Sequence, residues 1–298
     1  MTSTTTEAHL SRGVRVCRFR LAGPGGPRVG AAVGSDRVAD LTAVGIESLA
    51  VLLESTDPRR VVTALLSVAP QHPLSGVTLL APIDRQEVWA AGVTYLRSKK
   101  ARMEESDFSA TAYDRVYDAD RPEIFFKSVA EKVVGSGDAV GIRADATWNV
   151  PEPELALVMN SRGEWVGCAI GNDMSSRDIE GENLLYLPQA KTYDRSCAIG
   201  PWVGLETDEK VVRGWTIAIS ITREGQEVFA GETTIDQIKR SFTELAGWLW
   251  RSQRFPHGVL LLTGTGIVPD ESFTLCAGDS IRINVSGIGV LENTVGVV

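Results

Sequence analysis

The sequence of 298 residues predicts an α+β protein that is mostly β, with a small N-terminal domain before a larger, strand-rich domain. From residue 122 onward, short apolar segments alternate with Gly, Asn and Asp turns, which is typical of closely spaced strands. Only one stretch in that region, at about 235–252, has clear helical spacing. Because strands and helices do not alternate regularly, a mostly antiparallel fold is favoured over a parallel sheet with crossover helices.

The N-terminal domain is expected to combine strands and helices. Residues 14–42 alternate apolar and polar side chains around a Gly/Pro turn, which predicts two or three antiparallel strands. Residues 45–55 and 59–71 have helical spacing. New strand-rich segments start near residue 80, so we predict domains at 1–80 and 81–298. Residues 96–120 are charged and irregular, and we expect a lid there.

Composition limits the function classes. The net charge of -8 disfavours nucleic acid or an anionic membrane as the main partner. The four cysteines form no CxxC pair, which disfavours a zinc ribbon and suits a reducing cytoplasm. The polar N-terminus lacks the apolar core of a signal peptide, and no apolar run reaches 18 residues. We therefore expect a cytoplasmic protein without a membrane span.

Three carboxylates are predicted to meet at one end of a hairpin. The segment "VPEPELALVMN" is followed by the turn sequence "SRGE" and the apolar segment "WVGCAIGND". If the turn closes on Arg162 and Gly163, Ser161 faces Glu164, Glu154 faces Gly171, and Glu152 faces Asp173. Residues two apart on a strand, and residues directly opposite, share a face. The small Gly171 is then expected to leave room for a ligand beside Glu154.

Three carboxylates at one point repel one another unless they are protonated or hold a cation. An all-oxygen set suits a hard divalent ion, which is Mg²⁺, Mn²⁺ or Ca²⁺. The alternative is a solvated strand end with an ordinary turn aspartate. Two other segments attract interest: Lys191, whose alternative is a surface lysine, and Gly264-Thr265 of "TGTG", which can bind an anion through backbone N–H groups or form an ordinary tight turn.

The order "PEPELALVM", "GNDMSSRD", "LPQAKTYDRSCAIGP" and "LLTGTGIV" resembles the fumarylacetoacetate hydrolase superfamily over roughly residues 85–298. The resemblance implies a mixed β-roll catalytic domain and a homodimer or homotetramer. It also implies Mg²⁺ on Glu152, Glu154 and Asp173, an active-site lysine at Lys191, and Thr265 at the substrate carboxylate. Lys191 is the one cation that the sequence places near the reacting atoms.

Hydrolases and decarboxylases of this superfamily carry a His and a Glu that activate water. In the matching stretch "GVTYLRSKKA" these positions are Ser98 and Ala101, so the hydrolytic base is missing. Ser98 is then expected only to hydrogen-bond the substrate. The segments "VYDADRPEIFFKS" and "IEGENLLYLPQAKTY" look like the 2-dehydro-3-deoxy-D-arabinonate dehydratase branch, in which Glu123 is an additional acidic residue near the site; its alternative is a solvated strand start.

The resemblance predicts dehydration of a 2-keto-3-deoxy sugar acid, a small-molecule substrate, to a product such as 2,5-dioxopentanoate. A base takes a C3 proton and hydroxide leaves C4 with help from an acid. Lys191 is the base or a charged support, and Glu123 is the candidate acid. Two other classes remain open: a C–C hydrolase or decarboxylase acting on a diketo acid, and a non-catalytic metal-binding sensor.

Overall fold

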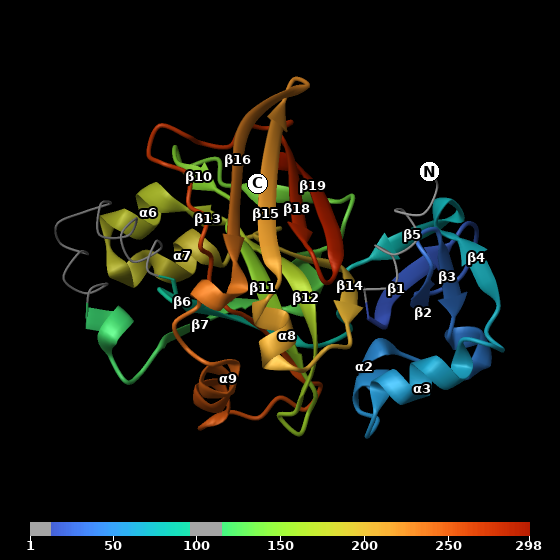
Figure 1. Cartoon of the computed structure of the whole chain (residues 1–298). Helices are drawn as coiled ribbons and strands as arrows, with labels where there is room; N and C mark the ends of the chain where they lie inside the picture. The colour runs from blue at the N-terminus through green and yellow to red at the C-terminus, as the bar shows by residue number, and fades with distance from the viewer. Residues whose placement is uncertain (1–12, 96–114) are drawn as a thin grey trace, which may run out of the picture.

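The computed structural model describes residues 13–95 and 115–298 (Figure 1). In this part of the chain the strands form a 12-stranded sheet, a 5-stranded sheet and a 2-stranded ribbon. The β-rich fold class predicted from the sequence is therefore confirmed. None of the helices in the described ranges is long and apolar enough to cross a membrane.

The N-terminal part builds one end of the large sheet and has the predicted strands and helices. Its elements are β1 (Arg15–Leu21), β2 (Arg28–Val33), β3 (Arg37–Asp40), a 3-10 turn (Thr42–Val44), α2 (Leu49–Leu53), α3 (Pro58–Leu65), β4 (Gln71–Pro73), a 3-10 turn (Leu74–Gly76) and β5 (Val77–Leu80). Helix α3 begins where the Asp57 side chain accepts a hydrogen bond from the N–H of Arg60 at 2.9 Å. β1 also pairs with the later strand β14 (Cys197–Gly204), so the domain boundary near residue 80 stays a prediction.

The rest of the large sheet follows the order β14-β12-β11-β17-β6-β7, with β17 and β6 parallel. Its strands are β6 (Glu87–Gly92), β7 (Glu123–Ser128), β8 (Val133–Val134), β11 (Pro153–Met159), β12 (Trp165–Asp173), β14 (Cys197–Gly204) and β17 (Val259–Leu262). The second sheet contains β9 (Ala139–Ile142), β15 (Thr216–Arg223), β16 (Gln226–Thr234), β18 (Ser280–Val285) and β19 (Gly289–Val297), and the ribbon pairs β10 (Asn149–Val150) with β13 (Ser175–Ser176).

The two faces of the β11–β12 hairpin pack against different cores. Leu155, Leu157 and Ile170 face the second sheet, where they pack with Ile219 and Ile283. Alternate residues point the other way, into a second apolar cluster. The carboxylates described below belong to this second face.

The hairpin register is correct at the carboxylate end, although the turn differs from the prediction. Glu154 lies opposite Gly171, as predicted. The predicted pairing of Ser161 with Glu164 is wrong, because Asn160 bonds to Glu164 across a three-residue loop that ends in Gly163 at φ 80°. One extra residue then bulges out of β12, between the partners of Val158 and Met159. The bulge compensates for the longer loop and restores the predicted register.

The helices of the larger domain differ from the prediction. The helix expected at about 235–252 is a 3-10 turn (Ile235–Gln237) followed by α9 (Phe242–Trp250). Ser241 caps α9 by accepting a hydrogen bond from the N–H of Glu244 at 3.1 Å. The pieces that the sequence did not predict include a 3-10 turn (Ala130–Lys132), α6 (Arg177–Glu182), a 3-10 turn (Leu184–Tyr186), α7 (Leu187–Lys191) and α8 (Glu209–Arg213). They are too short to show a helical period, yet α6 and α7 carry residues of the site.

Candidate active site

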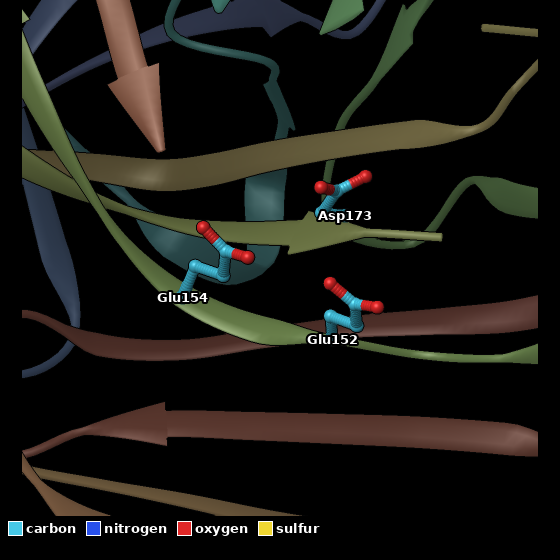
Figure 2. Close-up of side chains that lie close together, drawn as sticks. All are labelled: Glu152, Glu154 and Asp173. Carbon is cyan, nitrogen blue, oxygen red and sulfur yellow. The ribbon is translucent and has the colours of Figure 1, made fainter. Parts of the chain in front are cut away.

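Three carboxylates converge at the open end of the β11–β12 hairpin (Figure 2). Glu152, Glu154 and Asp173 are each at most 3% exposed, and one oxygen from each lies within 4.8 Å of the others. The N–H of Asp173 donates to the carbonyl of Glu152 at 2.9 Å, which fixes their pairing. The burial excludes the alternative of a solvated strand end. An all-oxygen set of this kind fits a hard divalent cation.

Glu154 is held by the chain from the loop after β17. The N–H of Gly264 donates to its Oε2 at 2.6 Å. Burial raises the pKa of Glu154 well above its usual range, and the charges of Asp173 and Glu152 raise it further. The space expected beside Gly171 is filled, because a Cβ there would lie 2.2 Å from the side chain of Leu262.

Three buried cations face the three carboxylates. Lys191, at the end of α7, lies 2.8 Å from Glu152 and 3.3 Å from Asp173. Lys127 on β7 contacts Asp173 at 2.5 Å, and Arg177 at the start of α6 contacts Glu152 at 2.9 Å. The surface alternative for Lys191 is wrong, and so is the expectation that it is the one nearby cation. The charges of the six groups balance formally in the metal-free chain.

Lys127 links the end of β12 to the end of α7. It is fully buried, and its ammonium donates to the carbonyls of Met174, at 2.9 Å, and Lys191. Burial lowers the pKa of Lys127, and the neighbouring Asp173 opposes this shift. The sequence carried an indication of this residue: Lys127 alternates with Glu123 and Phe125 on one face of β7.

Lys127→Met is expected to destabilise the metal-free protein by about 3 kcal/mol, because Asp173 stays buried while it loses its shortest ion pair. Mg²⁺ should restore part of this loss by compensating the same carboxylate. Urea denaturation with and without Mg²⁺ measures both effects. The exposed Lys132→Met is the matched control and should change stability by less than about 0.5 kcal/mol. Equal losses for the two variants would contradict the role of Lys127.

Glu123 borders the site at the start of β7. It pairs with Gly92 of β6, and a Cβ on Gly92 would lie 2.0 Å from the Glu123 carboxylate. Gly92 lines the same small hollow as the three carboxylates, together with Phe125 and Arg177. The structure therefore brings the Glu123 carboxylate to the edge of the site, and its role as an acid stays a prediction.

In the loop after β17, the backbone N–H of Gly264 contacts a carboxylate of the chain, and the substrate-binding role of Thr265 stays a prediction. Gly264 and Thr265 line the hollow. However, the N–H of Gly264 is taken by Glu154, so it holds a carboxylate of the chain instead of a substrate anion. The hydroxyl of Thr265 donates to the carbonyl of Ile267 at 3.1 Å and accepts from its N–H at 3.2 Å. Gly264 has φ 94°, and a Cβ there would lie 2.0 Å from Thr94.

Two predictions lie partly or wholly outside the described residues. Ser98 and Ala101 fall within 96–114, outside the described residues. The same range contains most of the predicted lid at 96–120. At its described end, Lys239 donates to the carbonyl of Tyr117 at 2.8 Å and pairs with Asp118 at 2.7 Å. The lid remains a prediction.

Fold and site together define a class: a β-rich protein with mixed sheets and a buried three-carboxylate centre suited to a divalent metal. The chain belongs to the fumarylacetoacetate hydrolase family, whose model, described as "Fumarylacetoacetate (FAA) hydrolase C-terminal", matches residues 87–296. The resemblance stated from the motifs is therefore confirmed.

Two curated relatives are sugar-acid dehydratases by name. The chain is 48% identical to the "Probable 2-keto-3-deoxyxylonate dehydratase" of Haloferax volcanii over 72% of this chain and 73% of the relative. It is 39% identical to the "2-dehydro-3-deoxy-D-arabinonate dehydratase" of Saccharolobus solfataricus over 76% of each. A solved structure described as "2-keto-3-deoxy-D-arabinonate dehydratase complexed with magnesium and 2,5-dioxopentanoate" matches with a TM-score of 0.76 and 30% identity, covering 95% of this chain and 99% of that chain.

Proposed function

We propose that this protein is a Mg²⁺-dependent hydro-lyase that dehydrates a 2-keto-3-deoxy sugar acid in sugar-acid catabolism. The substrate we favour is 2-dehydro-3-deoxy-D-arabinonate, with 2,5-dioxopentanoate and water as products. The observation that carries the proposal is the buried three-carboxylate centre in contact with Lys191. The identity to two proteins named as dehydratases supports the same reaction.

Glu152, Glu154 and Asp173 are the residues that would hold the metal. One carboxylate oxygen of each lies within 4.8 Å of the others, so one ion can bind all three. A bound Mg²⁺ would act as a Lewis acid toward the keto acid and make its C3 protons more acidic. The chain positions these ligands by the β11–β12 register and by the N–H of Gly264. The buried cations keep the carboxylates in place before an ion binds.

The chemical steps fall to side chains at the edge of this centre. The C3–H bond breaks and its proton passes to a base, a C3–C4 double bond forms, and the C4–O bond breaks as the departing hydroxide takes a proton to leave as water. For a pentonate, the resulting unsaturated 5-hydroxy acid then tautomerises to 2,5-dioxopentanoate. Lys191 acts as the base or as a charged support for the electron-rich intermediate, and Glu123 protonates the leaving hydroxyl. Thr265 is proposed at the substrate carboxylate, and Ser98 at a substrate oxygen. No activated water is needed, which is consistent with Ser98 and Ala101 in place of the hydrolytic pair.

Product analysis tests the proposal. With Mg²⁺, a 2-keto-3-deoxy pentonate is expected to lose one water and keep all of its carbons, which mass spectrometry and trapping of the semialdehyde will detect. Diketo acids should be poor substrates, because the water-activating pair is missing. Appearance of pyruvate or carbon dioxide at a comparable rate would overturn dehydration and favour the C–C hydrolase or decarboxylase. Binding of the pentonate without any turnover would favour the sensor.

We also propose the assembly, the location and the metal preference of the protein. We propose a homodimer or homotetramer, to be tested by sedimentation, and a cytoplasmic location, to be tested by cell fractionation. Mn²⁺ should replace Mg²⁺ more effectively than Ca²⁺, because Ca²⁺ prefers more ligands at longer distances than three carboxylates and a keto acid supply. Activity with each ion after chelation measures this order.

A further inference from the structure

A second cavity lies beside the three-carboxylate centre. The hollow at the carboxylates has a volume of only about 10 Å³, which is the room of a single water-sized sphere. The second cavity has a volume of about 300 Å³. Its walls include Glu123, Glu180, Arg121, Val116, Leu184 and Leu187. It is therefore large enough for the part of a sugar acid that the small hollow cannot hold.

The two spaces adjoin, because residues that line one lie next to residues that line the other. Glu123 lines the large cavity, and its carboxylate lies against Gly92, which lines the small hollow. On α6, Arg177 lines the small hollow and Glu180 lines the large cavity. Residues three apart on a helix are neighbours on one face, so the helix runs from one space to the other.

The chemistry of the large cavity differs from that of the metal centre. Glu180 is only 1% exposed, and its Oε2 accepts a hydrogen bond from the hydroxyl of the buried Ser175 at 2.7 Å, which orients the carboxylate. Arg121 is exposed, and its guanidinium lies 4.5 Å from the centre of the Trp248 ring on α9, so it sits at the rim. Two glutamates thus offer acceptors to hydroxyl groups and repel anions.

Resting on the proposed function, we propose that this cavity receives the hydroxylated tail of the substrate and that Glu180 determines specificity. Its carboxylate accepts a hydrogen bond from a hydroxyl beyond C4. The apolar Val116, Leu184 and Leu187 contact the carbon chain. An acid whose far end carries a carboxylate or phosphate is rejected, because that charge would be placed beside Glu180 and Glu123. The site is thereby restricted to 2-keto acids with one anionic end.

Glu180→Gln tests this role, since it removes the charge but keeps the size. We expect kcat/KM for a 2-keto-3-deoxy pentonate to fall about 10–100-fold, the effect of losing a hydrogen bond to a charged group. The ratio of kcat/KM for the pentonate to kcat/KM for its analogue with a carboxylate at the far end should fall at least about tenfold. Inhibition by pyruvate, which has no hydroxylated tail, should not change. Glu182→Gln, an exposed neighbour on α6, is the matched control and should behave as wild type.

Calorimetry tests this inference separately from the proposed reaction. It measures binding of the pentonate and of its dicarboxylate analogue in the presence of Mg²⁺. If the wild type binds the pentonate, rejects the dicarboxylate and performs no dehydration, only the reaction is wrong. If Glu180→Gln keeps wild-type affinity and selectivity for both acids, the role of Glu180 is wrong. Should Glu180→Gln fail to fold, Leu184→Trp fills the same cavity while both of its glutamates are kept. This variant should bind the pentonate more weakly and leave inhibition by pyruvate unchanged. Equal effects on the pentonate and on pyruvate would overturn the proposal.

Discussion

Glu152→Gln is expected to nearly abolish turnover and to weaken Mg²⁺ binding by more than about 100-fold, while the fold survives. Substituting a residue that only supports a metal ligand lowers metal affinity about 10–100-fold. Glu152 is proposed as a ligand itself, so a larger loss is expected. The amide also removes the negative charge that Lys191 and Arg177 contact at this position. The six buried groups then carry a formal charge of +1 in place of zero, which opposes the approach of a divalent cation.

Calorimetric titration with Mg²⁺, circular dichroism and activity at high Mg²⁺ measure these effects. The loss of a buried partner should cost about 3 kcal/mol of stability, which a domain with about 5–15 kcal/mol can sustain. The exposed Glu131→Gln is the matched control and should bind Mg²⁺ as the wild type does. Full activity of Glu152→Gln in metal-free buffer would show that the metal centre is wrongly assigned.

The carboxylate centre could be predicted from the sequence because it depends on local geometry. Glu152 and Glu154 share a face by the two-residue period of a strand, and a short hairpin brings Asp173 to them. Even so, the predicted turn was wrong, and a bulge in β12 compensated for it. Because a shift of one residue would have moved Asp173 to the opposite face, the correct outcome depended on a feature that the sequence pattern does not reveal.

The cations could not all be predicted, because they reach the site through long-range packing. Lys127 comes from β7, and Arg177 and Lys191 come from α6 and α7, helices too short to show a period. These contacts explain how a mostly buried hairpin can place carboxylates side by side. Each carboxylate lies near positive charge or, for Glu154, a backbone N–H, so repulsion is reduced before any metal binds.

The second cavity could not be predicted from the sequence either. Glu123 was selected by the family resemblance, but Glu180 lies in a motif whose spacing gives no reason to single it out. The cavity exists because α6 and the chain around Leu184 pack against the start of β7. Such a space depends on the relative placement of elements that are far apart in sequence, and neither periodicity nor composition encodes it.

Lys191→Met is expected to lower kcat by about 100–1,000-fold, the effect of removing electrostatic support from a reacting centre. Mg²⁺ affinity should not fall, because the variant removes a positive charge that contacts Glu152 and Asp173. A lower kcat with unchanged Mg²⁺ affinity distinguishes Lys191 from the proposed metal ligands, because loss of a ligand should lower both kcat and Mg²⁺ affinity. Lys127→Met is a useful comparison: it also removes a buried cation, but it should act mainly on stability.

Lys191→Arg then distinguishes the two roles that remain open for this lysine. A guanidinium keeps the positive charge but cannot serve as a base near neutral pH. If Lys191 only supports the developing negative charge, kcat of Lys191→Arg should be about tenfold or more above kcat of Lys191→Met. If Lys191 takes the C3 proton, both variants should be equally slow in single-turnover measurements, and exchange of the C3 protons with deuterated solvent should stop in both. A kcat for Lys191→Met within about tenfold of wild type would exclude either role, because a contact with two buried carboxylates would then serve the fold alone.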